Sequence, residues 1–136
     1  MTFTPYLFFV GTCREAMTHY QGIFGGELLI VSAEDMGAPA EFPRDMVMHA
    51  ALTSSDGALL FASDDPTVDV PGPKEGFRVS LNPLDPAEAK RLYDALADGG
   101  TVEQALEETM WSPAFAMLTD RFGIPWMIST EPAPEG

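Results

Sequence analysis

The sequence predicts an α+β fold in which one βαβββ unit occurs twice. The stretch EAMTHYQGIFGG, which begins at Glu15, resembles EAKRLYDALADGG, which begins at Glu88. Both read Glu-Ala-x-x-x-Tyr and both end in a glycine pair, at 25–26 and 99–100. Each stretch also lies between apolar runs of strand length. In a chain of 136 residues, a helix repeated at half-length spacing predicts two similar units, each with too little core to be stable alone.

The first half reads as a strand, a helix and three more strands. The apolar run at 4–10 predicts the first strand. Thr12 stands three residues before Glu15, which is the spacing of a capping box, so we expect a helix to begin there. The helix should end at Gly25-Gly26. Three further strands complete the unit, at 27–33, 46–53 and 58–63.

The second half repeats this order. A strand is expected at 77–81, and Asp85-Pro86-Ala87-Glu88 predicts a second capping box with proline at the first helical position. This helix should end at Gly99-Gly100. Three strands follow, at 101–107, 114–119 and 124–129. We therefore expect one domain over 1–136, made of a first module at 1–64, a second at 76–130 and a frayed tail at 131–136.

Composition excludes several classes of function. Seven Lys and Arg against 21 Asp and Glu give a net charge of −14, which argues against binding to nucleic acid or to anionic membranes. A single cysteine permits no disulfide within the chain and is typical of a reducing compartment. The first residues lack the features of a signal peptide, and no apolar run reaches membrane-span length. We expect a cytoplasmic protein.

Four motifs carry a resemblance to a known family: PYLFFVGTCREAMTHYQGIFGGEL, MHAAL, LLFASD and MWSPAFAMLTDRFGIPWMI. With the paired βαβββ layout, they resemble the vicinal oxygen chelate superfamily of glyoxalases, bleomycin-resistance proteins and dioxygenases, and within it the PhnB-like branch. The resemblance implies a curled mixed sheet around a cavity, and a homodimer. Ser112 and Ala116 stand where glycine is usual in the family.

The metal centre of the superfamily has no evident counterpart. Metal-dependent members hold a divalent ion with ligands from four strands, and the resemblance places those positions near Pro5, Phe61, Phe77 and Met127. None of these is a normal ligand for such an ion, so we expect no catalytic metal. A divalent metal with displaced ligands, in a lyase, isomerase or dioxygenase, remains the alternative cofactor. The chain also lacks a glycine-rich turn that opens a nucleotide-binding helix, which argues against a methyltransferase.

His49 is the best candidate for acid–base chemistry. It lies in the middle of a predicted strand, on the face shared by Val47, Ala51 and Thr53. If that face lines the cavity, an imidazole with a pKa near neutrality could transfer a proton there. The simpler interpretation is a histidine that hydrogen-bonds locally and shapes the pocket, since the sequence reveals no partner for it.

Four other residues carry weaker signals. Asp64 and Asp65 could bind a cation or an amine at the cavity rim, or could form a solvated turn. Trp111 could roof the cavity. Cys13, in the first turn of a helix, could be a reactive thiolate or a small, part-buried packing residue.

The predicted function is binding of a small, largely apolar or cationic molecule in an apolar cavity, without a catalytic metal. A metal-dependent enzyme and a non-catalytic dimeric interaction module are the alternatives. The predicted ligand-binding residues are His49, Phe61, Asp64, Phe77, Trp111 and Met127.

Overall fold

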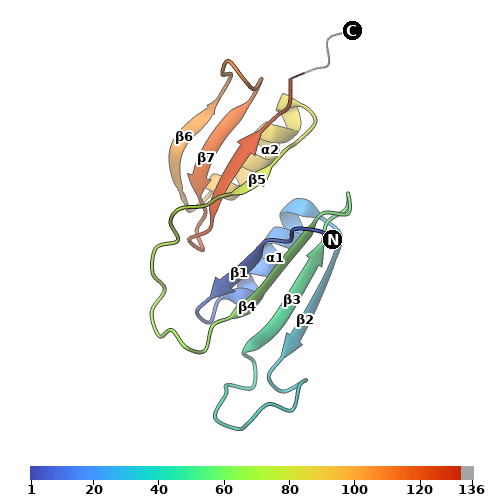
Figure 1. Ribbon diagram of the computed structural model, residues 1–136, viewed down its shortest axis with the longest axis vertical. Coiled ribbons are helices and arrows are strands. Elements are labelled where there is room, and N and C mark those ends of the chain that lie inside the picture. Colours follow the sequence, from blue (N-terminus) through green and yellow to red (C-terminus); the bar gives the residue numbers. More distant parts are fainter. Residues whose placement is uncertain (133–136) are drawn as a thin grey trace. The chain divides into compact units, whose positions relative to one another are not determined.

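A computed structural model describes residues 1–132 of the chain. Its elements follow the order β-α-β-β-β twice, so the predicted α+β repeat is confirmed (Figure 1). The chain divides into two compact units, Met1–Gly72 and Pro73–Gly136, called here unit 1 and unit 2. Within the described residues, neither helix has the length and apolar character needed to cross a membrane.

Unit 1 is a four-stranded mixed sheet covered by one helix. Its elements are β1 (Tyr6–Phe9), α1 (Cys13–Phe24), β2 (Glu27–Ser32), β3 (Val47–Thr53) and β4 (Leu59–Asp64). The strand order is β1-β4-β3-β2, with β1 parallel to β4 and the other pairs antiparallel. Helix α1 contacts β2, β3 and β4, and its buried side chains are Cys13, Ala16, Met17, Tyr20 and Ile23.

Unit 2 has the same topology. Its elements are β5 (Val79–Leu81), α2 (Pro86–Ala97), β6 (Thr101–Glu107), β7 (Phe115–Thr119) and β8 (Pro125–Ser129). The strand order is β5-β8-β7-β6, with β5 parallel to β8. Helix α2 contacts β6, β7 and β8. The repeat read from the two helices therefore extends to the strand order and to the single parallel pair in each sheet.

Each sheet has a face that packs on its helix and a face that does not, here called the open face. Strand side chains alternate between the two faces. In β1, Leu7 and Phe9 are buried while Tyr6 and Phe8 are exposed. In unit 2 the indole of Trp126 is almost fully buried, as expected for a core residue between sheet and helix. The open faces are where the fold leaves side chains available to a ligand.

Two details differ from the sequence-based expectations. The strand expected at 77–81 begins at Val79, so Phe77 precedes it; β5 is an edge strand, and its pairing with β8 starts at Val79 opposite Trp126. Thr12 makes no side-chain capping bond, so the first capping box is wrong. At the second helix, Asp85 does cap, accepting from the Glu88 N–H at 2.9 Å. Residues 133–136 of the expected frayed tail lie outside the described residues.

Close backbone packing explains the repeated glycine pairs. The second glycine of each pair, Gly26 or Gly100, lies between the helix and the next strand, immediately before that strand begins. A Cβ added at Gly26 would collide with the carbonyl oxygen of Thr53, and one added at Gly100 would collide with that of Thr119. Gly26 also has a φ of +89°, which a side chain rarely tolerates. The same strand-end carbonyl therefore excludes a side chain in both units.

Gly26→Ala should destabilise the protein by roughly 2–4 kcal/mol, from left-handed backbone strain plus the collision with Thr53. Gly22→Ala is the matched control, because Gly22 lies inside α1 with open space around its Cβ position. That change should stabilise by up to about 1 kcal/mol. Urea denaturation of both variants measures the two effects, and equal midpoints would contradict this account of the glycine pairs.

Candidate functional site

The open face of unit 1 carries an aromatic cluster, defined here as Tyr6, Phe8, His49 and Phe61. The ring centroids of Tyr6 and His49 are 5.9 Å apart, and those of His49 and Phe61 are 5.3 Å apart in an edge-on arrangement. Tyr6 and Phe8 lie 5.0 Å apart. Three strands supply these rings, because the parallel β1–β4 pairing sets Tyr6 opposite Phe61.

His49 has a polar partner that the sequence did not reveal. The Tyr6 hydroxyl lies 3.3 Å from the Nδ1 atom of His49, and the tautomer of the imidazole decides which group donates. The two residues are 43 positions apart, and only the strand order β1-β4-β3 brings them onto one patch. Their two polar groups lie among aromatic rings, so they can orient a ligand by hydrogen bonding.

Apolar side chains extend this patch across the open face. Leu29 on β2 pairs with Ala51 on β3, which in turn pairs with Phe61 on β4. Leu29 is 60% exposed and Phe8 is 51% exposed. Exposed apolar groups of this size gathered on one face are typical of an interaction or ligand surface.

Asp64 is not part of the open face. Its side chain is buried, and each carboxylate oxygen accepts one backbone hydrogen bond, from Cys13 N–H and from Val47 N–H, both at 3.0 Å. The end of β4 is thus tied to the start of α1 and to the start of β3. The solvated turn considered for Asp64 is wrong, and its carboxylate already has two partners within unit 1.

Unit 2 lacks the hydrogen-bond donors that Asp64 binds in unit 1. The pair Ala50–Ala62 in unit 1 and the pair Ala116–Ile128 in unit 2 hold the same place in their sheets. Each residue of the second pair is numbered 66 higher than its counterpart in the first. The same offset relates Asp64 to Thr130 and Val47 to Pro113. Pro86 likewise begins α2 where Cys13 begins α1. Proline has no N–H, so both donors that Asp64 binds are missing in unit 2.

In unit 2 the position that corresponds to Asp64 is taken by Thr130, because a carboxylate there would have no N–H donors to bind. The buried Thr130 Oγ1 has no hydrogen-bond partner among the described residues. The backbone carbonyl of Thr130 instead accepts from the Ser112 hydroxyl at 2.6 Å, and that hydroxyl also lies 2.8 Å from the Ala114 carbonyl. This network gives Ser112 a structural role.

Asp64→Asn should lower the free energy of unfolding by about 1–3 kcal/mol, because the amide nitrogen would face a buried N–H donor. Asp69→Asn makes the same chemical change at an exposed position and should stay within about 0.5 kcal/mol of the parent protein. Urea denaturation compares them. Equal stability of the two variants would show that the double hydrogen bond contributes little.

Cys13 is a packing residue. It is fully buried, and desolvation, with the nearby negative charge of Asp64 as the second cause, raises the pKa of its thiol to about 12. The thiol is therefore protonated at neutral pH. The reactive thiolate considered from its place at a helix start is wrong, because burial outweighs the helix N-terminus here.

The remaining candidates lie in unit 2. Phe77 precedes β5 and is half exposed. Trp111 is 59% exposed, and its ring packs edge-on against Phe115 at 5.4 Å. Met127, on β8, pairs with the exposed Ser80 on β5. Phe77 and Met127 offer apolar surface, and Trp111 adds one indole N–H donor to its apolar ring.

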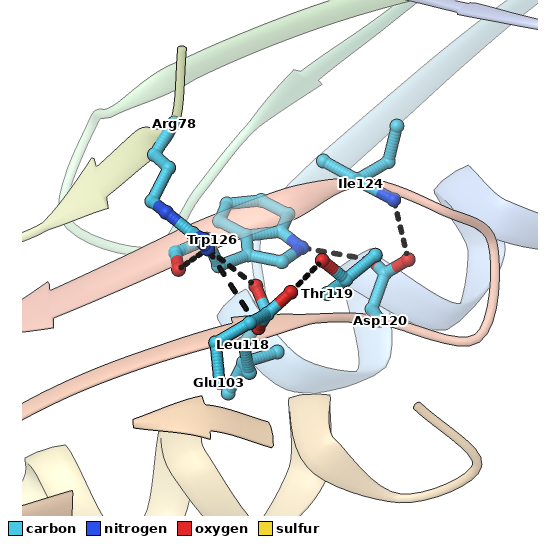
Figure 2. Close-up of polar contacts among 7 residues, drawn as sticks. All are labelled: Arg78, Glu103, Leu118, Thr119, Asp120, Ile124 and Trp126. Carbon is cyan, nitrogen blue, oxygen red and sulfur yellow. Dashed lines mark hydrogen bonds and ion pairs between the residues drawn. The ribbon is translucent and has the colours of Figure 1, made fainter. Parts of the chain in front are cut away.

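Sequence reasoning missed a polar network in unit 2 (Figure 2). The Arg78 Nη1 atom donates to the carbonyl oxygens of Leu118 and Trp126, each at 3.2 Å, and lies 3.8 Å from a Glu103 carboxylate oxygen. The other Glu103 oxygen accepts from the Thr119 hydroxyl at 2.6 Å. Positions 78 and 103 are far apart in sequence, and no motif links them.

A second polar group fixes the last hairpin. The buried Asp120 accepts from the backbone N–H groups of Phe122 and Ile124 through one oxygen and from the Trp126 indole N–H, at 2.8 Å, through the other. It anchors the turn and the indole together, which is a structural task.

The residues present do not fit a divalent metal centre. In the described part of the chain, no group of three or more His, Cys, Asp or Glu side chains is placed to hold a metal ion. The open-face strand positions Tyr6, Phe61, Ser80 and Met127 offer aromatic rings, two hydroxyls and a thioether. Zinc, magnesium and calcium take imidazole, thiolate or carboxylate ligands.

Comparison with known proteins settles the family. Residues 2–128 match the model of the Glyoxalase/Bleomycin resistance protein/Dioxygenase superfamily. The chain belongs to this superfamily. The sequence-based prediction of the superfamily is thereby confirmed, and its members' shared βαβββ layout agrees with the two units described above.

Individual relatives cover nearly the whole chain. Protein YjdN of Escherichia coli (strain K12) is 33% identical over 141 residues, which cover 95% of each chain. The solved structure of protein PA1353 from Pseudomonas aeruginosa is 41% identical, with a TM-score of 0.86 and coverage of 96% of this chain and 98% of that one. A PhnB protein from Bacillus cereus, described as a putative 3-demethylubiquinone-9 3-methyltransferase, shares the fold with 21% identity, a TM-score of 0.77 and coverage of 96% and 99%.

Proposed function

We propose that this protein binds a small molecule with an apolar or cationic group on the open face of unit 1, without a catalytic metal. The observation that carries the proposal is the aromatic cluster, whose rings are gathered from β1, β3 and β4 yet remain partly accessible. Tyr6 is 40% exposed and Phe8 51% exposed. A folded sheet gains by covering such rings, so a ligand that covers them removes apolar area from water.

The charge of the chain favours a cation over an anion at this patch. Aromatic faces attract cations through the ring quadrupole, and no lysine or arginine belongs to β1, β2, β3 or β4. The net charge of −14 adds a long-range attraction for positive ligands. Together these features support an aromatic or aliphatic cation as the ligand class.

We assign His49 the role of orienting the ligand through its bond with Tyr6. The same imidazole could serve as an acid–base group, and it is the catalytic residue to test first if a reaction is found. Phe77, Trp111 and Met127 are proposed as apolar ligand-contacting residues of unit 2, taken by itself. Asp64 is a poorer candidate than the others, since both of its oxygens already accept backbone hydrogen bonds.

Benzyltrimethylammonium should bind more tightly than neutral benzyl alcohol, because the cation adds an electrostatic attraction to the aromatic faces. Phe61→Ala should weaken binding of the cation by roughly fivefold, which is about 1 kcal/mol. Phe3→Ala, at an almost fully exposed phenylalanine outside the strands, is the matched control and should leave affinity unchanged. Amide chemical shifts followed during titration give the affinities.

Equal affinity for the cation and the alcohol would contradict the cationic part of this proposal. Equal loss in Phe61→Ala and Phe3→Ala would contradict the location. The metal-dependent alternative, a lyase, isomerase or dioxygenase with displaced ligands, would be favoured by stoichiometric Ni, Zn, Mn or Fe(II) that survives desalting and is lost in His49→Ala.

We also propose that the protein is a cytoplasmic homodimer. The superfamily to which the chain belongs typically pairs its modules across a two-fold axis, and the apolar groups on the sheet faces would gain from such pairing. Light scattering is expected to give twice the 14.7 kDa chain mass; a monomer across the micromolar range would contradict the dimer. If no small molecule binds, a non-catalytic dimeric interaction module is the interpretation that remains.

A further inference from the structure

We propose that Arg78 forms an anion-binding site on unit 2, where the outer edge of its guanidinium group takes a carboxylate or phosphate. This inference goes beyond the proposed function, which concerns apolar and cationic groups on unit 1. It rests on how the guanidinium is held, on which of its donors are used and on its immediate neighbours.

The guanidinium of Arg78 is fixed before any ligand arrives. Nη1 donates to two backbone carbonyls, of Leu118 on β7 and Trp126 on β8, which face each other in the β7–β8 ladder. Figure 2 shows the side chain reaching across to both carbonyls. The side chain is only 26% exposed. Because the strands hold one nitrogen, little rotamer freedom remains to be lost when an anion binds.

The opposite edge of the same group is unused. Every interaction of Arg78 with the described residues involves Nη1, which leaves Nε and Nη2 without a partner there. These two nitrogens form the parallel pair of donors that matches the two oxygens of a carboxylate or phosphate. Ser80 lies two residues further along, on β5, and its exposed side chain carries a hydroxyl group.

The other arginines of unit 2 show what a satisfied edge looks like. Arg91 donates from Nε and from Nη2 to the two carboxylate oxygens of Glu88, at 2.9 and 2.6 Å. Arg121 uses Nε for the Asp98 carbonyl and Nη2 for the Asp98 carboxylate, at 3.2 and 2.9 Å. The guanidinium of Arg78 is also held in place, but no carboxylate of the described residues binds its Nε and Nη2 atoms.

Glu103 does not fill this place. One of its oxygens lies 3.8 Å from Nη1, and the other is bonded to the Thr119 hydroxyl. The Glu103 carboxylate therefore lies next to Nη1 and leaves Nε and Nη2 open to an anion. Its charge opposes an incoming anion, so it should weaken the affinity of the site and make the site sensitive to substitution at position 103.

The test is titration of the full-length protein with benzoate and with phenylphosphate at constant ionic strength, with neutral benzamide as the ligand control. Saturable shifts of the Val79 and Ser80 amides and of the Arg78 Nε–H resonance are expected for both anions and not for benzamide. Arg78→Gln should reduce affinity at least about tenfold, and Arg78→Lys should lose most of it, because a lysine lacks the paired donors. The ratio of the two affinities distinguishes a carboxylate from a phosphate.

Two further variants make the result decisive. Arg91→Gln is the matched control and should bind as the parent does, because its edge is already occupied. Glu103→Gln should tighten binding by roughly three- to tenfold through loss of the opposing charge. This arm keeps Arg78 in place, so it decides the matter even if Arg78→Gln fails to fold.

Absence of saturable shifts in the parent protein, equal affinity in Arg78→Gln, or weaker binding in Glu103→Gln would overturn the proposal. None of these results bears on the cation-binding test, whose variants lie in unit 1. Conversely, failure of benzyltrimethylammonium to bind would leave the Arg78 site standing.

Discussion

Unit 1 depends on a single buried carboxylate that holds three elements at one point. Asp64 ends β4, and its two oxygens accept the first N–H of α1 and the N–H that begins β3. Both contacts join residues far apart in the chain, and both groups would be left unpaired in a buried place without the carboxylate. This joint ties the start of α1 to the sheet, and the buried side chains of the helix cover the same face. Burial, and after it the charge of this carboxylate, raises the pKa of the adjacent Cys13 thiol and keeps it protonated.

Unit 2 reaches the same topology with other local chemistry. Its helix begins with Pro86 and is capped by the Asp85 side chain, so no carboxylate from the last strand is required. A threonine takes the corresponding place, and Ser112 bridges the neighbouring backbone. The two units therefore share strand order, helix length and glycine pairs while differing in the interaction that closes each joint. The shared features are those that the fold requires, whereas the interaction at the joint can vary between the units.

The same comparison bears on function. One face of each sheet packs against its helix and forms the core. The side chains of Asp64, Asp120 and Ser112 make hydrogen bonds that hold the backbone in place. The side chains left over on the open faces differ in chemical character. Unit 1 presents rings with one imidazole, whereas unit 2 presents a guanidinium that is held by main-chain carbonyls. The proposed cation-binding patch and the proposed anion-binding group therefore lie on two copies of one βαβββ unit.

The sequence by itself determined the repeat, the element order and the two helix ends, because these depend on local signals: apolar periodicity, an aspartate–proline cap and glycine pairs. The superfamily was indicated by the resemblance of four motifs to those of known members. It also indicated that His49 lies on the face away from the helix-facing Ala50 and Leu52, which follows from alternation along one strand. Tertiary structure alone decided the rest. Tyr6 meets His49 only through the parallel pairing of β1 with β4, and Asp64 became a structural joint because it reaches N–H groups from two distant segments. Arg78 met Glu103 in the same way, across a sheet. Hydrogen bonds of this kind depend on which strands become neighbours, and that is settled by packing rather than by spacing along the chain.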